Sequence, residues 1–145
     1  MKSVLLKVIL IHIVFWFSLS GNAQTVPEIF DDCSGDMFFV SADEHPQWIY
    51  QKATLIEYLN EAIDNEASLK GISGHITVGL IINKKGKSCC QTIINNTESV
   101  IDSQRLKMIL DKMPFWKPAK QNGKPIPFLH FIKIEMADGK VIQSA

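Results

Sequence analysis

Arginine is almost absent from this chain, since Arg105 is the only one among 145 residues. Basic and acidic residues number 15 each, and no basic face or arginine stripe is visible. Proteins that bind nucleic acids need a basic patch to neutralise the phosphates. The composition therefore argues against nucleic acid as a partner.

Sequence motifs of the common enzyme classes are also missing. The chain contains no GxSxG, P-loop, HExxH or dinucleotide-binding fingerprint. Metal-ligand spacing is absent among the four histidines, His12, His45, His75 and His130. Cys90 and His130 are a candidate catalytic pair, because such pairs meet in space without a shared sequence signature. We predict no catalytic residue, no metal site and no cofactor, and therefore a protein that is not an enzyme.

No apolar run reaches the roughly 20 residues that a transmembrane helix needs. The longest run, residues 4–19, is interrupted by Lys7 and His12. Residues 21–23, Gly-Asn-Ala, then supply the small side chains that signal peptidase requires. We predict that residues 1–23 are a secretory signal peptide cleaved before Gln24. The alternative is an uncleaved anchor in the inner membrane.

Cysteine is scarce, with Cys33, Cys89 and Cys90 as the only examples. Their spacing fits neither a zinc site nor a CxxC redox motif. Export permits a disulfide, and an odd number leaves one thiol over. A bond between the neighbours Cys89 and Cys90 would close a strained ring, so we predict a bond from Cys33 to one of them. The alternative is that all three are small apolar core residues.

Apolar periodicity predicts two helices. The first covers residues 48–66, where Thr54 and Glu57 have the spacing of a capping box that would start its regular part. The second covers about residues 102–112, with Asp102 as its N-cap and Pro114 as its stop. The predicted buried stripes are Leu55, Leu59, Ala62 and Ile63 in the first helix, and Leu106, Ile109, Leu110 and Met113 in the second.

Alternating apolar residues predict three strands. The first and second cover residues 75–83 and 88–95, joined by a turn that contains Gly86. The third covers about residues 126–136, and the five residues after the turn at 137–140 either pair briefly or fray. Two sets of residues are predicted to face the helices, namely Cys90, Thr92 and Ile94 on the second strand and Ile126, Phe128, His130, Ile132, Ile134 and Met136 on the third.

The predicted fold class is α+β, with two helices packed on one face of a small three-stranded antiparallel sheet. The order along the chain is helix, strand, strand, helix, strand. Residues 24–47 are irregular and too few to own a core, so we expect an N-terminal extension packed on a single domain of residues 48–145.

This order of elements is similar to that of the TonB C-terminal domain over about residues 48–136. The strongest match is residues 113–125, which contain Met113-Pro114, Trp116-Lys117-Pro118-Ala119 and Asn122-Gly123-Lys124-Pro125. The Asn122-Gly123 pair in this segment also predicts a turn, because positive φ is cheap there. The Leu-rich first helix, Gly74 before an alternating strand and the hairpin Asn83…Gly86-Lys87 add to it. Domains of this family bind peptide segments of outer-membrane receptors in the periplasm, where the peptide adds as a strand to a sheet edge.

The resemblance implies a periplasmic module that binds a protein or peptide partner, such as an outer-membrane receptor, in connection with TonB-dependent transport. A full transducer also has a membrane anchor and a long Pro-rich spacer. In this chain, residues 24–47 lie between the predicted signal peptide and the domain. They span only about 80 Å when fully extended, at roughly 3.3 Å per residue. We therefore expect a stand-alone exported module that does not transmit force.

The last predicted strand, with its Pro127, would lie at an edge of the sheet, where unpaired N–H and C=O groups invite another strand. The alternative function is a self-associating scaffold domain of the cell envelope, a homodimer through the same edge. A further possibility is that residues 37–40 cover this edge. The predicted partner-binding residues are Phe128, Leu129, His130, Phe131, Ile132 and Lys133.

Overall fold

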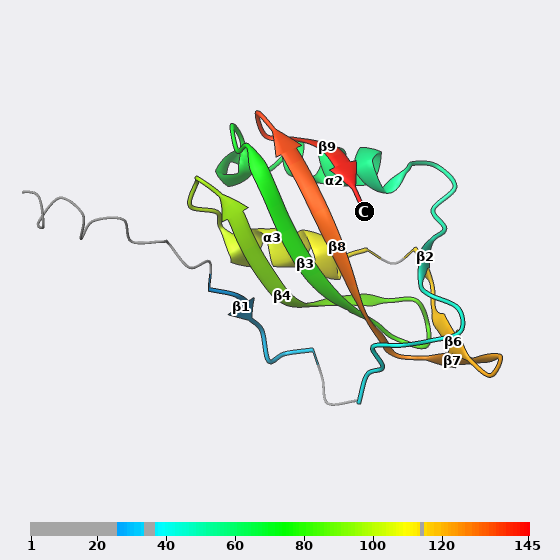
Figure 1. Ribbon diagram of the computed structural model, residues 1–145. Helices are drawn as coiled ribbons and strands as arrows, with labels where there is room; N and C mark the ends of the chain where they lie inside the picture. The colour runs from blue at the N-terminus through cyan, green and yellow to red at the C-terminus, as the bar shows by residue number, and fades with distance from the viewer. Residues whose placement is uncertain (1–25, 34–36, 114) are drawn as a thin grey trace, which may run out of the picture.

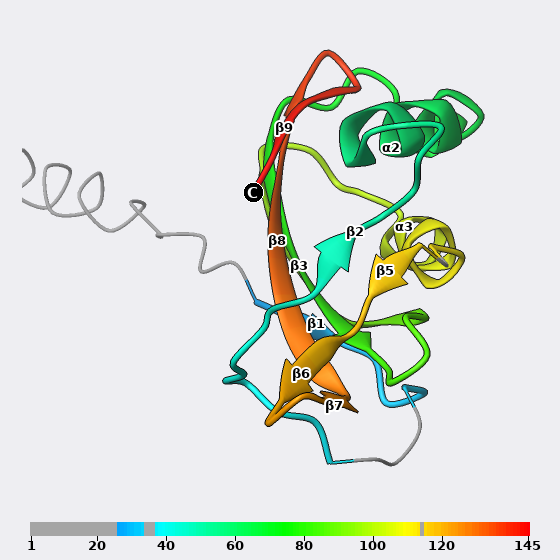
Figure 2. The same cartoon turned by 90° about the vertical axis from the view of Figure 1, so that its right-hand side faces the viewer.

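The computed structural model describes residues 26–33, 37–113 and 115–145 of the chain. The predicted signal peptide, residues 1–23, and the predicted helix stop, Pro114, lie outside these ranges. The fold has two layers, with helices α2 and α3 on one face of an antiparallel sheet (Figures 1 and 2). Within the described ranges, no helix combines the length and the apolar character that crossing a membrane requires.

The predicted three-stranded sheet is wrong, because the main sheet has five strands in the order β1-β4-β3-β8-β9. Its centre matches the three predicted strands and consists of β3 (Gly74–Ile82), β4 (Ser88–Thr97) and β8 (Phe128–Ala137). The added strands are β1 (Glu28–Ile29), beside β4, and β9 (Lys140–Ser144), beside β8. The pairing of β9 matches one of the two alternatives left open for the last five residues. β1 is only two residues long, so periodicity gave no signal for it.

Two small sheets lie outside the main sheet, one beside α3 and one at the lower end of the molecule (Figure 2). In one, β2 (Gln47–Trp48) pairs with β5 (Trp116–Lys117); in the other, β6 (Ala119–Gln121) pairs with β7 (Lys124–Ile126). Asn122-Gly123 forms the turn of the β6–β7 hairpin, with φ angles of 51° and 73°. This is the turn predicted from the Asn-Gly pair, which tolerates positive φ at both positions.

Helix α2 covers Leu55–Asp64 and therefore starts later than the predicted residue 48. The capping box explains the start, because Thr54 Oγ1 accepts the Glu57 N–H while the Glu57 carboxylate accepts the Thr54 N–H. Trp48, at the predicted start of the helix, instead belongs to β2. A single turn of 3-10 helix, η1 (Ala67–Leu69), follows. Helix α3 covers Ser103–Asp111 and is capped by Asp102 as predicted.

The core lies between the sheet and the two helices. Trp116 closes one end of it, since the side chain is 4% exposed and its ring packs against Trp48 and His130. The predicted stripe of α3 is buried throughout, whereas in α2 only Leu59 and Ile63 are fully buried. The central strands supply the apolar layer opposite the helices, namely Ile76, Val78, Leu80, Ile82, Ile93, Ile132, Ile134 and Met136.

A β-bulge changes the inward face of β4. Cys90 points into the core as predicted, but the next buried residue is Ile93, not Thr92 or Ile94. Leu80 pairs with Cys90 while the adjacent Gly79 pairs with Thr92, so one extra residue of β4 lies between them. An inserted residue reverses the alternation of the strand from that point on. The predicted inward set is therefore correct at its first residue and wrong after it.

Candidate functional site

Strand β8 carries all six residues that were predicted to bind a partner. Its pairing with β3 runs from Ile82 opposite Phe128 to Gly74 opposite Met136. On its other side, β9 pairs with the C-terminal part of β8, from Ile134 to Ala137. The expectation that β8 is an edge strand along its whole length is therefore wrong, because the last residues of the chain continue the sheet.

The N-terminal end of the same side of β8 is also covered. Phe39 forms a parallel bridge with Phe128, in which the Phe39 N–H donates to Pro127 O and the Leu129 N–H donates to Phe39 O, both at 2.9 Å. This contact matches the possibility that residues 37–40 cover the edge. The bridge ends there, since Phe39 is the one residue of this segment that pairs with β8 in the described part of the chain.

An open stretch remains at Phe131. The Leu129 N–H and the Lys133 N–H both point away from β3, the second of them to Ala145 O at 2.7 Å. Alternation along the strand then directs the Phe131 N–H and C=O outward as well. Among the described residues, neither of these two groups has a backbone partner, and the Leu129 C=O has none either. Three backbone groups are thus available for an added strand.

The side chains of the six predicted residues alternate between the two faces of the sheet. On the helix side, Phe128 and Ile132 are buried and His130 is half-buried. On the open side, Leu129 is half-buried, whereas Phe131 is 52% exposed. Lys133 is exposed on the open side as well. The structure thus places three of the six side chains on the uncovered face of the sheet.

His130 lies below the open stretch, on the face that the helices cover. Its ring centroid is 5.5 Å from that of Trp116. Burial lowers the pKa of His130, and the nearby His45 lowers it further. The imidazole is therefore held neutral at neutral pH.

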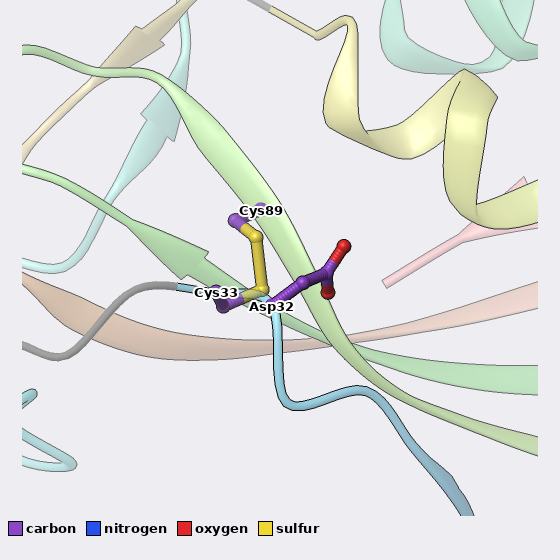
Figure 3. Close-up of side chains that lie close together, drawn as sticks. All are labelled: Asp32, Cys33 and Cys89. Atoms are coloured by element: carbon purple, nitrogen blue, oxygen red, sulfur yellow. A yellow bond between two sulfur atoms is a disulfide. The ribbon is translucent and has the colours of Figure 1, made fainter.

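A disulfide joins Cys33 to Cys89, as one of the two predicted pairings (Figure 3). The two Cα atoms are 5.6 Å apart. Cys89 points to the open face of the sheet, and Cys90 points into the core with its side chain fully buried. The bond ties the segment that follows β1 to the start of β4, so the N-terminal extension is covalently fixed to the domain.

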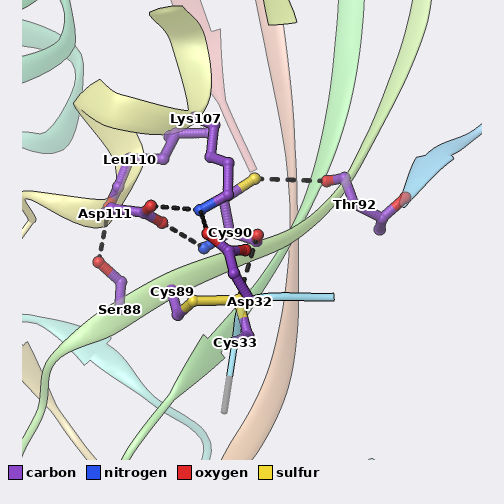
Figure 4. The surroundings of a disulfide bond; sticks show 9 residues. All are labelled: Asp32, Cys33, Ser88, Cys89, Cys90, Thr92, Lys107, Leu110 and Asp111. Carbon is purple, nitrogen blue, oxygen red and sulfur yellow. Dashed lines mark hydrogen bonds and ion pairs between the residues drawn. A yellow bond between two sulfur atoms is a disulfide. The ribbon is translucent and has the colours of Figure 1, made fainter. Parts of the chain in front are cut away.

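A buried lysine next to the disulfide adds a second attachment of the same segment (Figure 4). The Lys107 ammonium lies 3.0 Å from Asp32 and 2.5 Å from Asp111, and its side chain is 6% exposed. It also lies 5.5 Å from the ring centroid of Phe30. Burial alone would lower the pKa of Lys107, but the two carboxylates outweigh burial and raise it. Lys107 therefore stays charged and pairs with the extension.

Cys90 and His130, the candidate catalytic pair, do not meet in the structure. Cys90 and His130 both lie opposite Leu80, so two strand spacings, about 10 Å, separate them. Burial, and then the Asp111 charge, raises the pKa of Cys90 to about 12. The ligand atoms of Asp32, Cys33 and Cys89 come within 4.8 Å of one another, but the two sulfurs are bonded to each other. Neither arrangement supplies a thiolate.

Comparisons of the chain with protein-family models, with curated proteins and with solved structures found no match. The resemblance to the TonB C-terminal domain therefore rests on the motifs and element order described above. The sequence analysis left open whether residues 37–40 and the last five residues pair with this strand. It missed that Phe39 and Ala145 delimit an open stretch, because single pairing residues leave no periodic pattern. It also missed the pairing of Asp32 with Lys107, which only the packing of the extension on α3 creates.

Proposed function

We propose that this chain is an exported, periplasmic protein-binding module, similar to the TonB C-terminal domain, and not an enzyme. It binds an extended segment of an outer-membrane or periplasmic partner by strand addition, in connection with TonB-dependent transport. The observation that carries the proposal is the open stretch of β8 at Phe131. The disulfide supports export, because such bonds persist in oxidising compartments.

The open stretch has the groups that strand addition uses. Main-chain hydrogen bonds supply affinity in this mode, and side chains on alternate positions select the guest. The N–H and C=O of Phe131 and the C=O of Leu129 supply the bonds. The exposed Phe131 ring and the half-buried Leu129 and Ile81 side chains supply apolar contacts on the uncovered face.

A proline substitution tests the proposal directly. Phe131→Pro removes the outward N–H without touching a bond to β3, so we expect the fold to persist and peptide binding to be lost. The probes are synthetic peptides that cover the periplasm-facing segments of outer-membrane receptors from the same cell, measured by calorimetry. Circular dichroism reports folding.

Phe131→Ala is the matched control, because it removes the ring and keeps the N–H. This variant should bind the same peptides with about tenfold weaker affinity, which corresponds to about 1.4 kcal/mol. A folded Phe131→Pro protein that binds with unchanged affinity would show that this stretch is not the binding surface.

Self-association through the same stretch is the alternative function, and it has a different signature. Sedimentation velocity of the wild-type protein would then show a dimer, and Phe131→Pro would convert it to a monomer. A wild-type monomer that binds a receptor peptide supports the proposed function instead.

A further inference from the structure

The open stretch at Phe131 is too short to account for peptide binding by itself. After the loss of hydrogen bonds to water is counted, each hydrogen bond to the guest strand raises its affinity about tenfold or less. Three such bonds reach about the millimolar range before the cost of association is subtracted. A strand acceptor of useful affinity therefore needs more of the β8 edge than the three groups that are free.

We infer that the acceptor site continues from Phe131 back to Pro127, beneath residues 37–40, and that this segment is an exchangeable internal strand. The inference rests on the proposed function, because it names what competes for the same site. In this arrangement an extended apolar peptide binds by displacing Met37–Val40 from β8. The full site then presents the backbone of Pro127, Leu129 and Phe131 in one row.

The backbone attachment of the segment to β8 is limited to one residue. Two hydrogen bonds, both made by Phe39, hold it to Pro127 and Leu129. Met37 and Val40 are mostly open to solvent, with exposed fractions of 91% and 71%, whereas Phe38 and Phe39 are 40% and 46% exposed and so are partly buried. Displacing the segment exposes the covered parts of these two rings, and an incoming apolar strand can cover the same surface and replace the two bonds.

Both flanks of the segment are fixed independently of β8. Before it, the disulfide holds Cys33 to Cys89. After it, Asp43 N–H donates to Lys120 O at 3.0 Å, and Lys120 N–H donates to Glu44 O at 2.9 Å. Residues 37–40 can therefore leave β8 while the rest of the extension stays in place. The segment remains close to the edge and acts as a tethered competitor.

The experiment compares the wild-type protein with a variant in which residues 37–40 are replaced by Gly-Ser-Gly-Ser. The replacement keeps the chain length and both flanking attachments, and it weakens the internal strand. The probe is a synthetic peptide with the sequence of residues 37–42, added in trans and followed by calorimetry. We expect the variant to bind this peptide about tenfold more tightly than the wild type, because its acceptor site is vacant for a larger fraction of the time.

Hydrogen exchange of the same samples locates the binding. The Leu129 and Phe131 amides should become protected in the variant when the peptide is added. Phe39→Pro removes the hydrogen bond from the Phe39 N–H to Pro127 O and should also increase the affinity for the peptide. This second variant replaces the first if the first does not fold.

The outcomes separate the two ideas. Equal affinities of the wild type and both variants, with protection at Phe131 alone, would overturn the inference and leave the proposed function standing. Absence of peptide binding and of receptor-peptide binding in every folded form would overturn both.

Discussion

His130 is the histidine of β8, and it is held neutral by its position against Trp116 on the helix-covered face. Its lowered pKa follows from burial first and from the second histidine, His45, second. The alternation of apolar residues along the predicted strand correctly placed His130 on the face that the helices cover. The proximity of His45 could not be predicted, because it depends on how the extension folds over Phe128.

The lowered pKa of His130 predicts a loss of stability in acid. The pKa of the folded state lies below the ordinary value of 6.5, so the unfolded chain binds more protons as the pH falls past that value. The contribution of His130 to stability is present above pH 6.5 and is lost as the pH falls through the folded pKa. The free energy of unfolding in urea should therefore decline more steeply in the wild type than in His130→Gln between about pH 7 and 5. If the free energy of unfolding depends on pH identically in the wild type and in His130→Gln, groups other than His130 cause the decline.

The β3–β4 hairpin is the element whose turn depends most on glycine. Gly86 has a φ of 79°, and the carbonyl of Trp116 occupies the space that a Cβ would need. Asn83 Oδ1 supports the turn by accepting the N–H groups of Lys85 and Lys87. The hairpin tip and β5 therefore fit together only because position 86 has no side chain.

Gly86→Ala should destabilise the protein by about 2–4 kcal/mol, through positive φ and the collision with Trp116 combined. Gly123→Ala is the matched control, because Gly123 has a similar φ of 73° but open space around its Cα. Its cost should be about 1 kcal/mol, from positive φ alone. Urea denaturation measures both. Equal losses would show that the hairpin tip moves away from β5 at little cost.

The elements that the sequence predicted correctly are those with a repeated local signal. The stripe of α3, the Asp102 cap and the turns at Gly86 and Asn122-Gly123 each rest on residues close in sequence. The errors have nonlocal causes. The bulge opposite Gly79 and the pairing of β1 depend on which strands meet, and no periodic pattern encodes that. For the same reason, the pairing of residues 37–40 and of the last five residues could only be left open.

At the scale of the whole molecule, the N-terminal extension is part of the fold. It adds β1 to one side of the main sheet, covers part of β8 with Phe39 and supplies Asp32 to Lys107. The sequence predicted its packing on the domain and left open that residues 37–40 cover β8, but it gave no signal for β1. The disulfide was predicted as one of two pairings. Because adjacent side chains on a strand point to opposite faces of the sheet, only one of Cys89 and Cys90 could reach Cys33.

Removing the disulfide should lower the stability of the whole domain. The bond links residues 56 positions apart, for which the chain-entropy model gives a stabilisation of about 4 kcal/mol. We expect Cys33→Ser combined with Cys89→Ser to lose about 2–4 kcal/mol of unfolding free energy in urea. The wild type with and without a thiol reductant should reproduce the difference. Unchanged stability after complete reduction would mean that the loop is already restricted in the unfolded chain.

The disulfide also determines how the molecule responds to tension. A pull on the N-terminal end reaches β4 directly through the bond between Cys33 and Cys89, so residues 34–88 carry none of the load. Helix α2 and β3 lie in this bypassed stretch. While the bond is intact, the fully stretched chain is shorter by about 200 Å, at roughly 3.6 Å for each of the 56 bypassed steps. The oxidised protein therefore passes tension from Cys33 to β4 without extending the chain between the two cysteines.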